Sequence, residues 1–241
     1  MTAKLFCAVD TADLSEAEAL VRKLETVPVG IKLGLEFFTA QGPEGVNKIR
    51  RTCGDNTDIF LDLKLHDIPN TVAGAVRSAM RCRPRFLTLH ASGGEDMMKA
   101  ALAAATEEEK KSGVKAPALL AVTVLTHMDE KDLAEAGQMT PVADQVLRLA
   151  TLAKEAGLPG VVCSPHEIRL LRKHLGNDFL LVVPGIRPAG SAQGDQKRVM
   201  TPAEAMQAGA SCLVIGRPIT QAPDPAIAAQ EILISLEKRA A

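Results

Sequence analysis

Short apolar runs rich in Leu, Val and Ile alternate with longer amphipathic stretches along almost the whole chain. Runs of about four to eight apolar residues predict buried strands, and apolar residues that recur every three to four positions predict helices. Eight strands are predicted, at Leu5–Val9, Val29–Leu33, Ile59–Leu63, Phe86–Leu89, Leu119–Leu125, Gly160–Cys163, Leu180–Val183 and Cys212–Ile215. Helices are predicted between and after them, at Leu14–Leu24, Gly42–Arg51, Val72–Arg81, Met97–Lys110, Val142–Ala156, His166–Leu175, Ala203–Ala208 and Pro225–Leu236.

This alternation indicates the fold class. Eight strand-then-helix units in 241 residues predict an α/β fold of the (β/α)8 TIM-barrel type, which typically takes about 250 residues. A doubly wound open sheet is the competing architecture. Its dinucleotide-binding form needs a GxGxxG turn after the first strand, and the segment Val9-Asp10-Thr11-Ala12-Asp13 has none. We therefore expect one barrel domain over residues 1–241, with no linker.

Composition narrows the classes of partner. The chain is 46% hydrophobic and 24% charged, enough for one large core. Its net charge is -1, it has no Trp or Tyr, and no basic stripe stands out. A nucleic-acid surface built on base stacking and phosphate neutralisation is therefore not expected, and the expected partner is a small molecule.

The chain also lacks the signals of export and of disulfide or zinc frameworks. No apolar run reaches the roughly 18 residues of a membrane helix, and Met1–Phe6 leads directly into a strand pattern, so we expect no membrane association and a cytoplasmic protein. The cysteines are odd in number, widely spaced and without a CxxC pair, which predicts small buried side chains. They are Cys7, Cys53, Cys82, Cys163 and Cys212.

The segment from Asp62 to Thr71 carries the strongest chemical signal. Side chains alternate faces along a strand, so Asp62 and Lys64 are expected on one face, with leucines on the other. Burial of such a pair costs desolvation free energy that the ionic attraction only roughly offsets. The pair is therefore better evidence for a functional site than for stability, although a structural ion pair is the simpler alternative.

In a barrel, the carboxyl ends of the strands surround one mouth, where barrel enzymes have their active sites. Asp10, Lys32, Asp62 and Lys64 are expected there, and Asp67 follows at the next helix start. Each has an ordinary alternative: Asp10 and Asp67 as helix caps, and Lys32 as a side chain that extends to solvent. Together they predict a cluster of alternating charge.

A second signal suggests phosphate binding. The segment Pro184–Gln196 after the seventh strand is long and contains three glycines and Arg187, and Gly216-Arg217-Pro218 follows the eighth strand. Barrels often bind phosphate with the loops after strands 7 and 8, where glycines let backbone N–H groups approach and arginine supplies a charged fork. An ordinary flexible surface loop is the alternative for Pro184–Gln196.

These motifs resemble the orotidine 5'-phosphate decarboxylase family from end to end. The matching segments are Ala8-Val9-Asp10, Ile31-Lys32-Leu33-Gly34, the DxKxxDIPNT motif at Asp62–Thr71, His90-Ala91-Ser92-Gly93-Gly94, Val122-Thr123-Val124-Leu125-Thr126, Pro184-Gly185-Ile186-Arg187-Pro188, Gly194-Asp195-Gln196 and Val214-Ile215-Gly216-Arg217-Pro218. The resemblance implies a homodimeric barrel that converts orotidine monophosphate to uridine monophosphate and carbon dioxide. It implies no metal and no organic cofactor.

The resemblance also implies roles for the charged residues. Lys64 would donate the proton to C6 of the pyrimidine and Asp62 would lie beside the departing carboxylate, with Lys32 and Asp67 completing the array. The partner subunit's site would be reached by Asp67, Ile68 and Thr71.

Further residues would bind the substrate. Asp10 and Lys32 would hold the ribose hydroxyls and Thr126 the pyrimidine edge. The phosphate region would comprise Arg187, Gln196, Gly216 and Arg217.

Two other functions fit parts of the pattern. A metal-dependent decarboxylase or aldolase-like barrel for a sugar phosphate shares the Asp-x-Lys-x-x-Asp spacing. A magnesium site would need a carboxylate beside Asp62 at the end of the second strand, where this chain has Lys32, and Glu36 lies a turn later. A non-catalytic nucleotide-binding or scaffold protein is the other alternative, and the intact charges argue against it.

Overall fold

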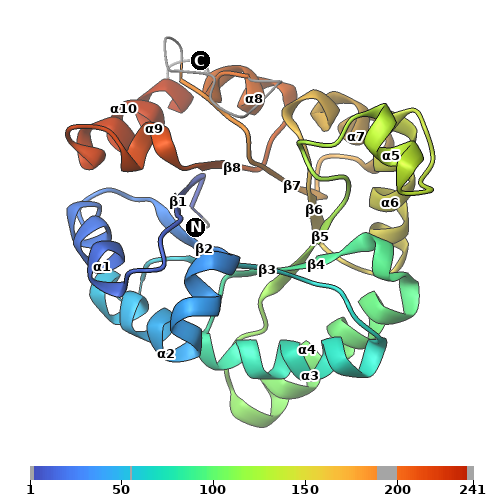
Figure 1. The fold of residues 1–241 in the computed structure, drawn as a ribbon, viewed down its shortest axis with the longest axis horizontal. Coiled ribbons are helices and arrows are strands. Elements are labelled where there is room, and N and C mark those ends of the chain that lie inside the picture. Colours follow the sequence, from blue (N-terminus) through green and yellow to red (C-terminus); the bar gives the residue numbers. More distant parts are fainter. Residues whose placement is uncertain (1–2, 55, 189–199, 238–241) are drawn as a thin grey trace.

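Eight parallel strands close into a barrel in the computed structural model, which describes residues 3–54, 56–188 and 200–237. Neighbouring strands pair in sequence order, and β1 pairs with β8 to close the ring (Figure 1). The strands are β1 Leu5–Val9, β2 Gly30–Leu33, β3 Ile59–Leu65, β4 Phe86–His90, β5 Ala118–Val122, β6 Gly160–Val162, β7 Leu180–Val183 and β8 Cys212–Ile215. The predicted (β/α)8 barrel is confirmed.

Helices surround the barrel on its outside (Figure 1). The α-helices are α1 Leu14–Lys23, α2 Leu35–Cys53, α3 Pro69–Ala79, α4 Glu95–Ser112, α5 Glu130–Glu135, α6 Val142–Glu155, α7 Ile168–Leu175, α8 Pro202–Ala208, α9 Arg217–Thr220 and α10 Pro225–Glu237. In the described ranges there are also single turns of 3-10 helix, at η1 Met80–Cys82, η2 Ala91–Gly93 and η3 Pro165–Glu167. Within the described ranges, no helix has the length and apolar character to cross a membrane.

The strands have two different apolar faces. Outward side chains such as Leu5, Ile31 and Leu61 are buried between sheet and helices in the large core. Inward side chains form a smaller core inside the barrel, where the rings of Phe6, Phe60 and Phe86 lie 5.3 to 5.7 Å apart. These rings fill the inside of the barrel. Inward side chains closer to the carboxyl ends of the strands therefore lie on an apolar layer.

Glycine is needed opposite this ring cluster. Gly30 pairs with Phe6 across the β1–β2 ladder. A Cβ atom added to Gly30 would collide with the Phe6 ring, so β2 begins with the one residue that leaves room for it.

The first helix, α1, is capped by a residue other than Asp10. Asp13 caps α1 by accepting a hydrogen bond of 2.8 Å from the backbone N–H of Glu16. This is the ordinary role of an aspartate at a helix N-cap. The alternative that Asp10 caps this helix is therefore wrong.

Candidate active site

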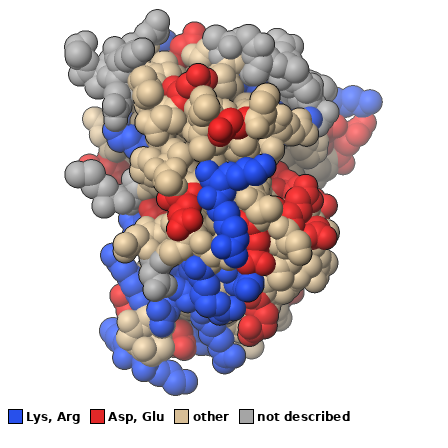
Figure 2. Space-filling view, turned by 90° about the vertical axis from the view of Figure 1, so that its left-hand side faces the viewer, with Lys and Arg blue, Asp and Glu red and all other residues tan. Residues whose placement is uncertain are grey.

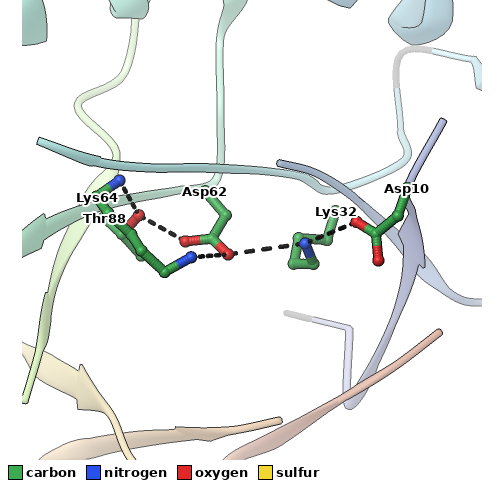
Figure 3. A network of polar contacts seen from close by, with 5 residues as sticks. All are labelled: Asp10, Lys32, Asp62, Lys64 and Thr88. Atoms are coloured by element: carbon green, nitrogen blue, oxygen red, sulfur yellow. Dashed lines mark hydrogen bonds and ion pairs between the residues drawn. The ribbon is translucent and has the colours of Figure 1, made fainter. Parts of the chain in front are cut away.

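Asp10, Lys32, Asp62 and Lys64 form one continuous chain of alternating charge at the carboxyl ends of β1, β2 and β3 (Figure 3). Lys32 Nζ lies 3.4 Å from Asp10 Oδ1 and 3.7 Å from Asp62 Oδ2. Lys64 Nζ donates to the same Asp62 oxygen at 2.8 Å. The predicted cluster of alternating charge is confirmed as a geometric arrangement.

Asp62 is the centre of this chain and is held as an anion. Burial by itself raises the pKa of its carboxyl group, but the positive charges of Lys32 and Lys64 and the hydrogen bonds from Lys64 and Thr88 outweigh burial. The net result is a pKa below the usual aspartate value. A buried carboxylate with this many partners is one whose desolvation is well compensated.

The backbone of β3 departs from a regular strand at Lys64. Its φ is 49°, in the left-handed region that a residue with a Cβ atom rarely adopts, and the pairing of β3 with β4 shifts register between Leu61 and Leu65. Simple strand alternation, on which the expected orientation of Lys64 rested, therefore does not hold at this residue. Such strain persists only where the surroundings enforce it, and it is concentrated at functional sites.

Thr88 on β4 helps to hold Lys64 in this conformation. It was not predicted as a site residue from the sequence. Its side chain is fully buried, and its hydroxyl accepts a hydrogen bond of 2.9 Å from the Lys64 backbone N–H while donating one of 2.8 Å to Asp62 Oδ1 (Figure 3). One hydroxyl thus joins the strained backbone of Lys64 to the carboxylate of Asp62. The available signal was a polar residue at an inward position of an otherwise apolar run, which is weak because threonine is a common strand residue.

Two histidines border the charged chain. The His66 and His90 rings lie 5.3 Å apart, and burial, His66 and Lys64 together lower the pKa of His90. A lowered histidine pKa favours the neutral ring near neutral pH. His90 therefore adds no positive charge beside Lys64 at that pH.

The charged chain forms one wall of a cavity of about 280 Å³ at the barrel mouth. The opposite wall is formed by segments that follow β5, β7 and β8 and includes Thr126, Gly185, Arg187, Gly216 and Arg217. Eight sequence-predicted site residues therefore line one cavity: Asp10, Lys32, Asp62, Lys64, Thr126, Arg187, Gly216 and Arg217. Gln196, also predicted to bind the phosphate region, lies outside the described residues.

Arg187 is anchored at the far wall of this cavity. It is buried, with an exposed fraction of 9%, and its Nη1 donates to the carbonyl of Ile186 at 3.0 Å. Its backbone N–H donates to the carbonyl of Met200 at 3.1 Å. This hydrogen bond joins Arg187 to Met200, the first described residue before α8.

Asp67, Ile68 and Thr71 do not line this cavity. All three are exposed, and Ile68 has an exposed fraction of 67%. Asp67 Oδ1 accepts a hydrogen bond from the Ile68 backbone N–H, whereas the N-cap position of α3 is Ile68 itself. The alternative that Asp67 is the N-cap of this helix is therefore wrong.

The position that would hold a metal-binding carboxylate next to Asp62 is occupied by Lys32, and Glu36 is an exposed residue in the first turn of α2. In the described part of the chain, no group of three or more His, Cys, Asp or Glu side chains has the arrangement of a metal site. All five cysteines are buried, as predicted.

Comparisons with known proteins agree with this geometry. A family model described as "Orotidine 5'-phosphate decarboxylase / HUMPS family" matches residues 3–232. Proteins named orotidine 5'-phosphate decarboxylase from Rhodospirillum rubrum and Paramagnetospirillum magneticum are 54% and 51% identical to this chain. The first match covers 95% of this chain and 92% of that protein, and the second covers 96% and 97%.

A solved structure is similar over the same extent. The crystal structure of orotidine 5'-phosphate decarboxylase from Lactobacillus acidophilus superposes with a TM-score of 0.85 at 37% sequence identity. The match covers 98% of this chain and 99% of that chain. Similarity to solved structures therefore extends over the barrel and its surrounding helices.

Proposed function

Because the chain belongs to the orotidine 5'-phosphate decarboxylase / HUMPS family, we propose that it is a carboxy-lyase that converts orotidine 5'-monophosphate to uridine 5'-monophosphate and carbon dioxide. This is the last step of de novo pyrimidine nucleotide synthesis. The observation that carries the proposal is the chain of alternating charge from Asp10 to Lys64, in one cavity with Arg187 and Arg217.

The reaction explains why a fixed cation is needed. Loss of carbon dioxide from C6 of the pyrimidine leaves a carbanion with no adjacent electron sink. The ammonium of Lys64, held 2.8 Å from Asp62, stabilises that developing charge and then donates a proton to C6. Preorganised charge of this kind is usually the largest single contribution to catalysis.

Asp62 has a second role in this proposal. It orients Lys64 and lies beside the substrate carboxylate. Its low pKa keeps it negatively charged at neutral pH, so it repels that carboxylate until carbon dioxide leaves. Lys32, between Asp10 and Asp62, keeps the array close to neutral before the substrate enters.

The far wall of the cavity would bind the rest of the nucleotide. Arg217 and Arg187 supply charged forks for the phosphate, with backbone groups at Gly216 and with Gln196 completing the region. Asp10 and Lys32 would bind the ribose hydroxyls and Thr126 the pyrimidine edge. Binding free energy from the unreactive phosphate then helps to hold C6 against Lys64.

We further propose a homodimer in which each site is completed by the partner subunit. Asp67, Ile68 and Thr71 lie next to the charged chain in sequence yet are exposed and outside its cavity, which is the placement expected of residues that serve a neighbouring copy. Ile68 places an apolar side chain, 67% exposed, beside Asp67, and a partner subunit packed on this segment would bury it.

Mixing two inactive variants tests the shared site. Lys64→Ala chains and Asp67→Ala chains should each form inactive dimers. A hybrid dimer contains one site with both residues intact, so random mixing should restore about a quarter of wild-type activity. Absence of any recovery after proven subunit exchange would show that each site is built from one chain.

The main alternative is a metal-dependent barrel acting on a sugar phosphate. Lys32 disfavours it, because its ammonium already lies 3.7 Å from Asp62 where a metal-binding carboxylate would be expected. The deciding experiment is a decarboxylation assay of purified protein with orotidine 5'-monophosphate in excess chelator. Full activity is expected, with Lys64→Ala inactive beside it; loss of activity that added magnesium restores would favour the alternative.

A further inference from the structure

A second and larger hollow, of about 440 Å³, lies at the opposite end of the barrel from the charged chain. It is formed by three consecutive loops that lead into β3, β4 and β5. The three segments that line it are 56–59, 83–85 and 112–116. The amino ends of barrel strands are usually concerned with stability, so a polar hollow there needs its own explanation.

Cations converge on this hollow from two of the loops. Arg83 and Arg85 come from the turn before β4, and Lys115 comes from the turn before β5. Among the described residues that line it, the only carboxylate is Asp58, whose Oδ2 accepts a hydrogen bond from the Ala3 backbone N–H. The described lining therefore carries three cations against one carboxylate.

The three cations differ in their surroundings. Arg85 has its guanidinium 5.7 Å from the centre of the Phe86 ring, one of the three rings inside the barrel. Arg83 has a φ of 49° between two buried residues, Cys82 and Pro84, which leaves its side chain as the exposed member of the turn. Neither Arg83 nor Lys115 forms an ion pair with any carboxylate in the described ranges.

The hollow is part of a wider basic surface. No acidic residue occurs between Asp67 and Glu95, a stretch that contains Arg77, Arg81, Arg83 and Arg85. The turn η1 packs on α2, whose last turn adds Arg50 and Arg51. Figure 2 shows Lys and Arg side chains gathered over the lower part of the face that carries α1 and α2. No basic stripe was expected from the sequence; four of these arginines are close in sequence, and the fold adds Arg50 and Arg51 from a distant helix.

We propose that this hollow is a binding site for a small anion with at least two adjoining phosphate groups, either free pyrophosphate or the diphosphate end of a nucleotide. Arginine forks match phosphate oxygens in pairs, and a lysine adds a point charge. Asn56, which also lines the hollow, supplies a polar side chain. The volume of this hollow is suited to a small molecule.

The site is tested with pyrophosphate and, separately, ADP as probes, by isothermal titration calorimetry at low ionic strength. The background variant Arg217→Ala should weaken phosphate binding in the barrel mouth, so that the remaining binding reports the second hollow. One pyrophosphate per chain is expected. Tighter binding of ADP than of pyrophosphate would identify a nucleotide as the ligand, and the reverse would identify the free anion.

Substitutions in the hollow then decide the assignment. In the Arg217→Ala background, Arg83→Asn with Lys115→Gln should weaken binding at least about tenfold, because two charge-assisted contacts are lost. Asparagine tolerates the left-handed backbone at Arg83, and thermal unfolding checks that the variant is folded. Lys111→Gln, an exposed cation outside the lining, is the matched control and should have less than about a twofold effect.

Three outcomes would overturn the proposal: no binding in the Arg217→Ala background, binding that the Arg83 and Lys115 changes leave intact, or an equal loss in Lys111→Gln. Decarboxylation by the Arg83→Asn, Lys115→Gln protein without added anion should equal that of the wild type. The proposal is therefore independent of the reaction assigned to the barrel mouth.

Discussion

The hydroxyl of Thr88 donates a hydrogen bond of 2.8 Å to Oδ1 of Asp62, and this contact links two strands of the barrel at the centre of the charged chain. The same hydroxyl accepts from the Lys64 backbone N–H. A side chain with no charge of its own therefore fixes both the acceptor of the Lys64 ammonium and the backbone that carries it. Positioning of this kind matters because small displacements in an active site cost large factors in rate.

Thr88→Val should lower kcat for decarboxylation by about 10- to 100-fold with a smaller change in KM, because valine has the same shape and loses both hydrogen bonds at once. Thr88→Ser keeps the hydroxyl and should retain most of the activity. Steady-state kinetics on orotidine 5'-monophosphate measures both.

A merely structural role for Thr88 would give a different pattern. Both variants would then lose stability in chemical unfolding, and kcat per folded molecule would be unchanged in Thr88→Val. That result, or equal loss of kcat in the serine and valine variants, would refute the positioning role.

The strands could be predicted closely from sequence because a buried parallel strand is a continuous apolar run. β1, β7 and β8 have the predicted bounds, whereas β5 ends at Val122 instead of Leu125. The short helices α5 and α9 were missed because six and four residues are too few to show a helical period. α2 was predicted to begin at Gly42; the helix starts at Leu35 and is broken at Gly42, whose φ is 59°.

Residues of the candidate site could be predicted where a charged residue stands out from its neighbours in the sequence. Asp62 and Lys64 are charged residues in an apolar strand, and Arg217 follows a strand end next to a glycine, so sequence alone identifies them. Thr88 gave little signal because threonine is common in strands. The left-handed backbone of Lys64 gave none, because only tertiary contacts hold a non-glycine residue in that conformation.

Arg217→Ala should lower kcat/KM by about two to three orders of magnitude, with part of the loss in kcat. The phosphate is remote from C6, and the binding free energy that Arg217 supplies is used to position the reacting ring. Steady-state kinetics on the purified variant measures the loss. Lys131→Ala, on the exposed helix α5, removes a cation without touching the cavity and is the control. An unchanged kcat/KM in Arg217→Ala would refute this role.

Arg172 should be a major contributor to stability. Its Nε donates to the Gly209 carbonyl at 2.7 Å, its Nη2 to Ser211 Oγ at 2.9 Å, and its Nη1 to the carbonyls of Gly176, Asn177 and Phe179. One guanidinium therefore joins the end of α7 to the turns before β7 and β8. Arg172→Lys keeps the charge but loses the fork, and should lower the free energy of unfolding by about 2 to 3 kcal/mol in urea denaturation.

The matched control for Arg172 is Arg169→Lys, on the same helix and exposed. It should change the unfolding free energy by less than about 0.5 kcal/mol. Equal effects of the two substitutions would mean that the five hydrogen bonds of Arg172 contribute nothing beyond an ordinary surface arginine.

Asp62 should make the protein less stable in acid. Its pKa in the folded protein lies below the ordinary aspartate value of 3.8, so its ionisation contributes stability that is fully present above that value. The contribution is lost as the pH falls through the lower, folded pKa. Urea unfolding from about pH 6 to about pH 3 should therefore show the stability advantage of wild type over Asp62→Asn shrinking steadily below about pH 4.

Asp178→Asn, which changes an exposed aspartate, serves as the control for general effects of acid, and its difference from wild type should stay nearly constant over the same range. The direction of the Asp62 effect depends on whether burial or the nearby positive charges have the larger influence on the pKa of its carboxyl group. Burial alone would raise the pKa and make neutralisation in acid favourable to the fold, whereas Lys32 and Lys64 reverse that tendency. An advantage of wild type that grew on acidification would mean that burial dominates and that the two lysines do not hold Asp62 as an anion.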